Sequence, residues 1–294
     1  VPFYIYYSMF GFQRVGDFIW AAGDQQARGF LIGATAGRTT LAGEGLQHQD
    51  GHSLLLFGAV PNCVTYDPTF AYELAVIVHD GLRRMFVEHE RVFYYITTMN
   101  ENYAQPPMPR GVEQGILKGL YLLQIGGRGR VRATLVGSGT ILREVIAAAE
   151  LLEKDFSIPA DVFSAPSFGE LRREALDCER WNMLHPEQAP RVPYVQQCFK
   201  DREGPVIAAT DYMRSVPDQV RKWVAGQYVT LGTDGYGRSD SRTQLRKHFE
   251  VDRHFIVLAA LKALADEGKV DRATPAAAIA KYGIDVDKPD PLRT

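Results

Sequence analysis

Residues 131–165 constrain the fold most, because they combine two apolar runs with a helical pattern between them. Residues 131–136 and 160–165 are rich in apolar and β-branched side chains, and residues 141–154 carry apolar side chains at helical spacing. This order predicts a βαβ unit, in which the two strands are parallel and the crossover is right-handed. The sequence therefore predicts an α/β fold with a mostly parallel sheet.

The first hundred residues indicate further strands and helices. Residues 3–7 suit a buried strand, and the residues after them carry apolar side chains at helical spacing. Six glycines between residues 29 and 52 predict one long loop, which is the usual place for function. Residues 54–60 and 92–98 read as strands, and a helix is expected between them, from 67 to about 84.

A division of the chain is expected near residue 125, before the glycine-rich residues 126–129 and after a short helix over 112–122. This gives one domain over residues 1–125 and a second over 126–294. In the second domain, strands are also expected over 206–210 and 228–232, with a helix from about 216 between them. A helix over 255–267 is expected to close the fold.

Composition excludes several classes of partner. The chain has 33 Lys and Arg against 35 Asp and Glu, so no global field attracts nucleic acid or an anionic membrane. The apolar runs are shorter than the ~20 residues of a membrane span. Three dispersed cysteines read as reduced thiols, which predicts a cytoplasmic protein. The chain opens on an apolar run from Val1 without an initiator Met, so we expect the sequence to be a piece of a longer protein.

Glu44, His48 and His52 form the first candidate constellation, at positions i, i+4 and i+8 of the glycine-rich loop. A histidine beside a carboxylate suits proton transfer, so we favour an acid/base or substrate-binding loop. Zinc binding is a weaker alternative, since glycines make a rigid helical platform doubtful. The remaining interpretation is that His48 and His52 are solvated surface residues without a function in catalysis or binding.

Three other features have both a structural and a functional interpretation. Gly137, Ser138 and Gly139 precede a helix, but Leu142 stands where a dinucleotide fingerprint requires a small residue, which favours a tight turn over a phosphate site. The polar segment 232–242 reads as a turn with ion pairs or as an interface.

A group of aromatic residues surrounds the first strand and the turn after it. Such side chains most often belong to the hydrophobic core, although the end of a strand is where α/β sheets bind ligands. The members of the group are Tyr4, Tyr6, Tyr7, Phe10 and Phe12.

Long motifs at these same positions resemble one enzyme family, the homodimeric bacterial pyruvate dehydrogenases. The motifs are residues 6–14, 21–29, 43–48, 61–63, 66–68, 99–103, 178–182 and 231–235, so the resemblance covers essentially the whole chain. It implies a thiamine diphosphate enzyme of transketolase-like fold. Residues 1–125 would be the end of the pyrimidine-binding middle domain, and residues 126–294 the carboxy-terminal domain.

The resemblance also implies roles for four residues. A ring at the position of Phe10 stacks on the aminopyrimidine of thiamine diphosphate, with Tyr7 beside it, and Glu44 and His48 line the reaction cavity. The implied reaction is oxidative decarboxylation of pyruvate, with transfer of the acetyl group to the lipoyl group of a dihydrolipoyl acetyltransferase. A homodimer is implied as well.

Two elements of the family are missing from these residues. The Gly-Asp-Gly motif that binds Mg²⁺ and diphosphate does not occur, so no metal ligand is assigned. The glutamate that activates the aminopyrimidine is also expected upstream of Val1, so this segment alone is expected to be inactive. The alternatives are a non-catalytic dimerisation or assembly module, a transketolase, or a 2-oxoglutarate dehydrogenase.

Overall fold

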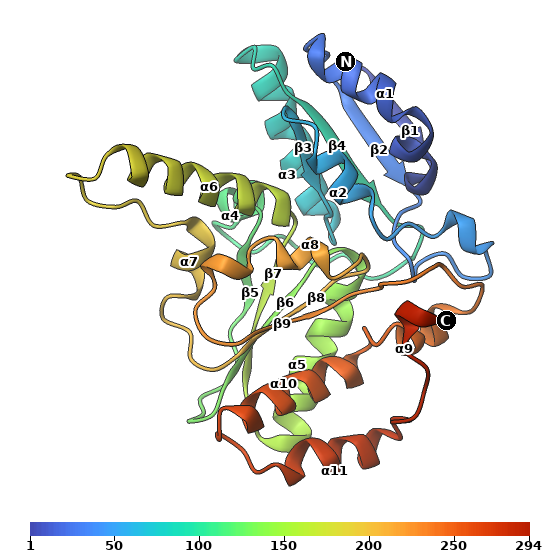
Figure 1. The fold of residues 1–294 in the computed structure, drawn as a ribbon, viewed down its shortest axis with the longest axis vertical. Helices are drawn as coiled ribbons and strands as arrows, with labels where there is room; N and C mark the ends of the chain where they lie inside the picture. The colour runs from blue at the N-terminus through green and yellow to red at the C-terminus, as the bar shows by residue number, and fades with distance from the viewer.

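The computed structural model describes residues 1–294 as two α/β units, each built on its own sheet (Figure 1). The first sheet has the order β1-β2-β4-β3 and is entirely parallel. Its strands are β1 (Phe3–Tyr6), β2 (Phe30–Ala34), β3 (Cys63–Tyr66) and β4 (Phe93–Thr98). Its helices are α1 (Gly11–Asp24), α2 (Ser53–Gly58) and α3 (Ala71–Leu82), and short turns occur at Ser8–Phe10, Leu46–His48 and Arg83–Val87.

The second sheet has the order β5-β7-β6-β8-β9, with β5 antiparallel to β7 and the other pairs parallel. The strands are β5 (Tyr121–Gln124), β6 (Ala133–Gly137), β7 (Ala160–Ser164), β8 (Val206–Ala209) and β9 (Tyr228–Leu231). The helices are α4 (Glu113–Lys118), α5 (Leu142–Phe156), α6 (Phe168–Leu184), α7 (Tyr194–Phe199), α8 (Ser215–Asp218), α9 (Arg242–His248), α10 (Arg253–Asp266) and α11 (Ala273–Tyr282). The predicted βαβ unit is thus confirmed as β6-α5-β7.

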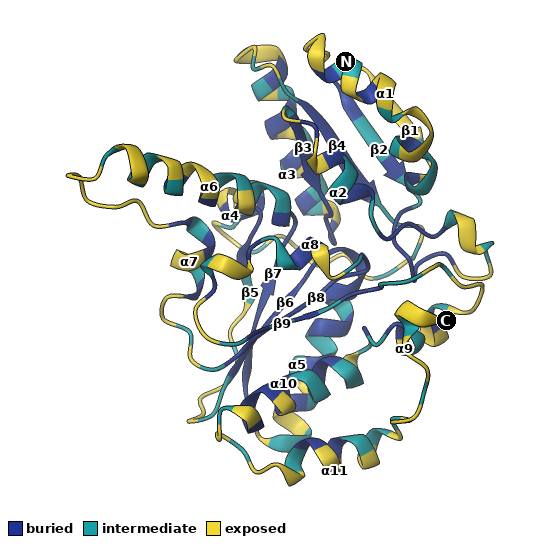
Figure 2. Cartoon of the chain, viewed as in Figure 1, coloured by how far each residue is buried: buried dark blue, intermediate teal, exposed yellow.

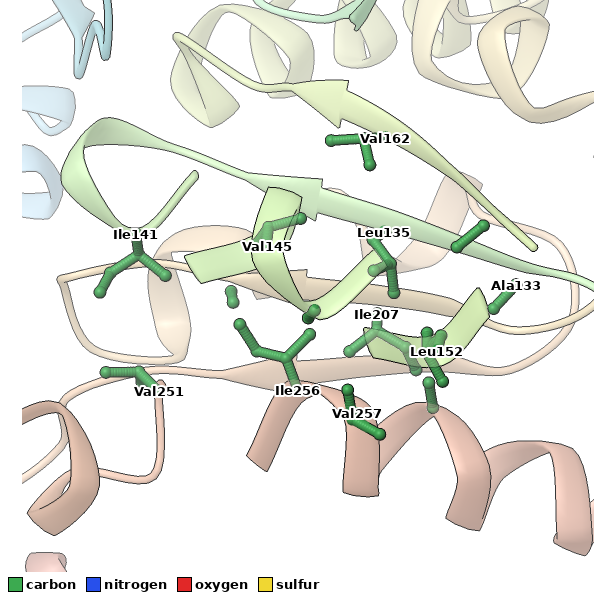
Figure 3. Packing of buried hydrophobic residues seen from close by; sticks show 14 of the residues in the cluster. Ala133, Leu135, Ile141, Val145, Leu152, Val162, Ile207, Val251, Ile256 and Val257 are labelled. Atoms are coloured by element: carbon green, nitrogen blue, oxygen red, sulfur yellow. The ribbon is translucent and has the colours of Figure 1, made fainter. Parts of the chain in front are cut away.

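The core of the second unit lies between its sheet and the helices α5 and α10. Figure 3 shows Leu135 and Ile207 of the sheet beside Leu152 and Ile256 of these helices. All four side chains are fully buried, and this burial is the main stabilising term for the unit. A second cluster joins the two units, because Phe57 and Val60 of the first unit pack in it with residues of the second.

Two sequence predictions in the first unit are wrong. Residues 54–60 were expected as a strand, but Ser53–Gly58 is helix α2, because the Asp50 carboxylate accepts hydrogen bonds from the first backbone N–H groups, at His52 and Ser53. A short apolar run does not distinguish these two structures by its period. The predicted long loop also contains strand β2, whose Gly33 allows Tyr95 and Ser8 to approach the backbone.

Smaller differences occur elsewhere. The expected helix over 112–122 is the shorter α4 followed by β5, which already pairs in the second sheet, so the change of sheet precedes the expected boundary at 125. Strand β3 and the helices α6, α7, α9 and α11 were not expected, and α11 follows the helix that was expected to close the fold. None of the helices combines the length and the apolar character that crossing a membrane requires.

Candidate functional site

Tyr7 and Phe10 lie at the carboxyl end of β1, where the chain turns into helix α1. Buried Ser8 anchors this turn by donating its hydroxyl to the carbonyl of Thr35, 3.1 Å away. The two ring centroids are 6.0 Å apart, and Tyr7 keeps 41% of its surface exposed. Two aromatic rings with free surface therefore stand together at the sheet edge where α/β proteins bind ligands.

His48 comes from the loop between β2 and α2 and reaches the same place. Its ring centroid lies 5.3 Å from that of Tyr7 and 5.2 Å from that of Phe10, edge-on to the latter. Its Nδ1 atom is 3.2 Å from a carboxylate oxygen of Glu44. That contact lacks hydrogen-bond geometry, so Nδ1 is buried without a hydrogen-bond partner. The structure thus brings together all four residues singled out from the sequence.

Arg14 is a fifth member of the site that the sequence analysis did not identify. Its guanidinium carbon lies 4.1 Å from the centre of the Phe10 ring, in a cation–π contact. The i, i+4 spacing of Phe10 and Arg14 at the start of α1 was the available signal, because such pairs face each other on a helix.

His52 lies away from the Glu44–His48 pair. Its Nε2 atom is 2.7 Å from the side-chain oxygen of Gln13, and its backbone N–H donates to Asp50 at the start of α2. No group of three His, Cys, Asp or Glu residues has the arrangement of a metal site. The zinc alternative therefore has no ligand set in this loop.

The Gly137-Ser138-Gly139 turn packs against a carboxylate and is unsuited to a phosphate. The Ser138 hydroxyl donates to Asp67 at 2.8 Å, and a side chain at Gly139 would lie 2.6 Å from the same carboxylate. Burial raises the pKa of Asp67 to about 6, although hydrogen bonds from Thr97 and Ser138 oppose the shift. The interpretation as a tight turn is the one that fits.

The other aromatic residues near β1 divide between core and surface. Phe12 packs edge-on against buried Phe57, and Tyr6 is partly buried. Tyr4 is 63% exposed, and Figure 2 shows exposed residues along helix α1. Phe3, Tyr4 and Ile5 thus leave apolar side chains exposed on the edge strand β1, and Phe18 leaves one exposed on α1.

The polar segment 232–242 extends from the second sheet to the loop that carries Glu44 and His48 (Figure 1). The N–H of Gly43 donates to the carbonyl of Asp240 at 3.0 Å, and the N–H of Arg238 donates to the side chain of Gln49 at 2.6 Å. The segment therefore connects the two units within the chain, and its Asp234 and Arg242 form ion pairs with Arg214 and Glu101, as the turn interpretation expects.

Each of the two units matches a known protein-family model. Residues 1–106 match the pyruvate dehydrogenase E1 component middle domain, and residues 119–252 match the transketolase-like TK C-terminal domain. The chain is 62% identical over 294 residues to the pyruvate dehydrogenase E1 component of Pseudomonas aeruginosa, covering 99% of this chain and 33% of the relative. It is 60% identical over 295 residues to that of Escherichia coli K12, with the same coverage. The chain thus spans about a third of the length of these relatives.

Solved structures show the same fold at low sequence identity. A transketolase from Campylobacter jejuni has a TM-score of 0.63 at 18% identity, over 89% of this chain and 35% of that one. A transketolase from Pichia stipitis in complex with sedoheptulose-7-phosphate has a TM-score of 0.64 at 17% identity, over 99% and 36%. A split-gene transketolase described as an inactive β4 tetramer has a TM-score of 0.57 at 18% identity, over 90% and 76%. The transketolase-like fold is therefore shown.

Proposed function

Since the chain belongs to the family of pyruvate dehydrogenase E1 components, we propose that it supplies the pyrimidine-facing part of a thiamine diphosphate site for oxidative decarboxylation of pyruvate. The observation that carries the proposal is the convergence of Tyr7, Phe10, Glu44 and His48 from two separate loops. The acetyl group would pass to the lipoyl group of a dihydrolipoyl acetyltransferase. A cytoplasmic homodimer is part of the same proposal.

The residues present fit the aminopyrimidine end of the cofactor. Tyr7 and Phe10 retain free ring surface, which a planar heteroaromatic ring can cover by stacking. The buried Nδ1 of His48 has no hydrogen-bond partner, and such an atom is costly unless a bound group satisfies it. No group of three His, Cys, Asp or Glu residues here has the arrangement of a metal site, so we propose that the part of the relatives' length outside this chain holds the diphosphate and Mg²⁺.

The cofactor, when bound, supplies the carbon nucleophile and the electron sink for decarboxylation. Phe10 and Tyr7 orient the pyrimidine by stacking. His48 holds or moves a proton at a ring nitrogen, with the Glu44 carboxylate 3.2 Å from Nδ1. When protonated, His48 also stabilises negative charge that develops on the substrate oxygen.

The alternative function is a non-catalytic dimerisation or assembly module. Exposed apolar side chains on β1 and α1 favour it, since Ile5 is 66% and Phe18 74% exposed. The two functions are compatible in one protein, and cofactor binding distinguishes a catalytic site from a purely structural module. By contrast, the relatives at 54–62% identity give no support to a transketolase or 2-oxoglutarate dehydrogenase activity.

The test is decarboxylation by the full-length protein with thiamine diphosphate, Mg²⁺, pyruvate and lipoylated acetyltransferase. We expect carbon dioxide release coupled to lipoyl acetylation, and little release with 2-oxoglutarate. A full-length protein that neither binds thiamine diphosphate nor releases carbon dioxide would leave the assembly function as the better interpretation.

A further inference from the structure

The loop that carries Glu44 and His48, here called the site loop (residues 35–52), is fixed along its length by the second unit. Backbone and side-chain groups of the second unit contact it at several points. The contacts are Thr39 N–H to the Asp211 carboxylate at 3.1 Å, Arg242 Nε to the Thr40 carbonyl at 2.8 Å, Gly43 N–H to the Asp240 carbonyl at 3.0 Å, and Met213 N–H to the Gly51 carbonyl at 2.8 Å.

Gln49 makes the cross-unit contact next to His48 itself. Its side chain is fully buried and uses both ends of the amide. Nε2 donates to the carbonyl of Leu41 at 3.1 Å, and Oε1 accepts from the backbone N–H of Arg238 at 2.6 Å. One amide therefore joins the two arms of the site loop to each other and to the second unit.

Gly237 makes this close contact possible. A side chain at Gly237 would collide with the carbonyl oxygen of Leu46 and would lie 3.0 Å from Cβ of Gln49. Leu46 begins the turn Leu46–His48 that carries the imidazole. A shift of the backbone at Gly237 would therefore move Leu46 and, in the same turn, His48.

We propose that Gln49 is a positioning residue, whose hydrogen bond from Arg238 holds the turn Leu46–His48 so that His48 stays against Tyr7 and Phe10. This inference rests on the proposed function of the site. Its physical reason is that a general acid or base works only within hydrogen-bond reach of the reacting group, and small misplacements of such groups cost large factors in rate. Gln49 acts through His48 and does not itself touch the reacting atoms.

The experiment compares four variants of the full-length enzyme. Gln49→Ala removes the acceptor for the Arg238 N–H, and His48→Ala alone is the reference for the double variant. Gln47→Ala is the matched control, because Gln47 lies in the same turn and is exposed. We expect Gln49→Ala to lower kcat by at least about tenfold. We expect Gln47→Ala to stay within about twofold of wild type.

The fourth variant, His48→Ala combined with Gln49→Ala, separates positioning from general damage. If Gln49 acts through His48, this double variant is no slower than His48→Ala alone, because coupled residues are non-additive. A further loss in the double variant would overturn the inference. Unchanged turnover in Gln49→Ala, with His48→Ala inactive, would also overturn it and leave the proposed function intact. Unchanged turnover in His48→Ala would instead remove the proposed function.

Hydrogen exchange in the cofactor-free enzyme provides a readout that does not depend on activity. In Gln49→Ala the N–H groups of Arg238 and of residues 43–48 should exchange faster, while those of β6 and α5 stay protected. Unchanged exchange at Arg238 would contradict the assigned hydrogen bond. Should Gln49→Ala fail to fold, Gly237→Ala tests the same contact, with Gly58→Ala as control because nothing lies near that position. Full activity in Gly237→Ala would then overturn the inference.

Discussion

The Nδ1 atom of His48 lies 3.2 Å from the carboxylate of Glu44, although the two residues are not on one α-helix. Gly45 is extended, and the turn Leu46–His48 brings the imidazole back over Glu44. A loop, and not a helix, therefore brings residues at i and i+4 together. It places the Glu44 carboxylate and the His48 imidazole beside the rings of Tyr7 and Phe10. A helix would have required a regular backbone that the glycines of this segment disfavour.

Phe10→Ala should weaken binding of thiamine diphosphate to the full-length protein. Loss of one stacking surface is worth about 1 kcal/mol, or roughly a fivefold rise in the dissociation constant. Calorimetric titration with Mg²⁺ present measures this. Phe86→Ala is the control, because Phe86 is a 38% exposed phenylalanine outside the site. An unchanged dissociation constant for Phe10→Ala would place Phe10 outside the cofactor site.

Asp67→Asn should stabilise the full-length protein increasingly as the pH rises from about 4 to about 7. Burial raises the pKa of Asp67 from 3.8 to about 6, so the folded state holds a proton that the unfolded state releases. Raising the pH therefore costs the wild type stability, by about 2 to 3 kcal/mol for such a shift, and the amide avoids this cost. Thr97 still has an acceptor, and Ser138 can accept from the amide.

Urea unfolding of wild type and Asp67→Asn at several pH values measures this difference. Asp24→Asn is the control, since Asp24 is exposed on α1 and its replacement should change little at any pH. A difference between wild type and Asp67→Asn that is the same at all pH values would show that Asp67 is not the buried titrating group described here.

Arg246→Ala should loosen the contact between the two units. Arg246 donates to Glu101 at 3.3 Å through one guanidinium nitrogen and contacts it through a second, with side-chain exposures of 7% and 11%. Burial would raise the pKa of Glu101, but Arg246 and Arg143 outweigh it and lower the pKa to about 2. Removing Arg246 leaves that charge under-compensated, which typically costs about 3 kcal/mol for a buried pair.

The unfolding free energy of Arg246→Ala is best compared with that of Lys262→Ala. Lys262 and Asp266 form an exposed pair, with side-chain exposures of 62% and 50%, so its loss should cost less than about 0.5 kcal/mol. Equal effects of the two substitutions would mean that the Glu101–Arg246 pair does not hold the two units together.

The parts of the fold that the sequence predicted are those in which local pattern and tertiary environment agree. The β6-α5-β7 unit has apolar runs of the right lengths and one clear helical face. Prediction failed at α2, where the hydrogen bonds that Asp50 accepts at the start of the helix outweigh a strand-like run. It also failed at β2, where Gly33 is part of a strand and gives Tyr95 and Ser8 room to pack.

The candidate site divides in the same way. Tyr7, Phe10, Glu44 and His48 were named through a family resemblance, whereas the residues alone left surface, core and metal interpretations open. Gln49 and Arg238 are 189 positions apart, and no local pattern reports a contact over that separation. Only the packing of the second unit on the site loop brings them together.

The most direct test of the account is the lipoyl-dependent turnover of His48→Ala in the full-length enzyme. His79→Ala is the matched control, because His79 is exposed on α3 outside the site. The account predicts that His48→Ala folds normally and loses at least about 100-fold in turnover, as expected for removal of an acid/base group, while His79→Ala keeps wild-type turnover. Wild-type turnover in His48→Ala would contradict the assignment of this site.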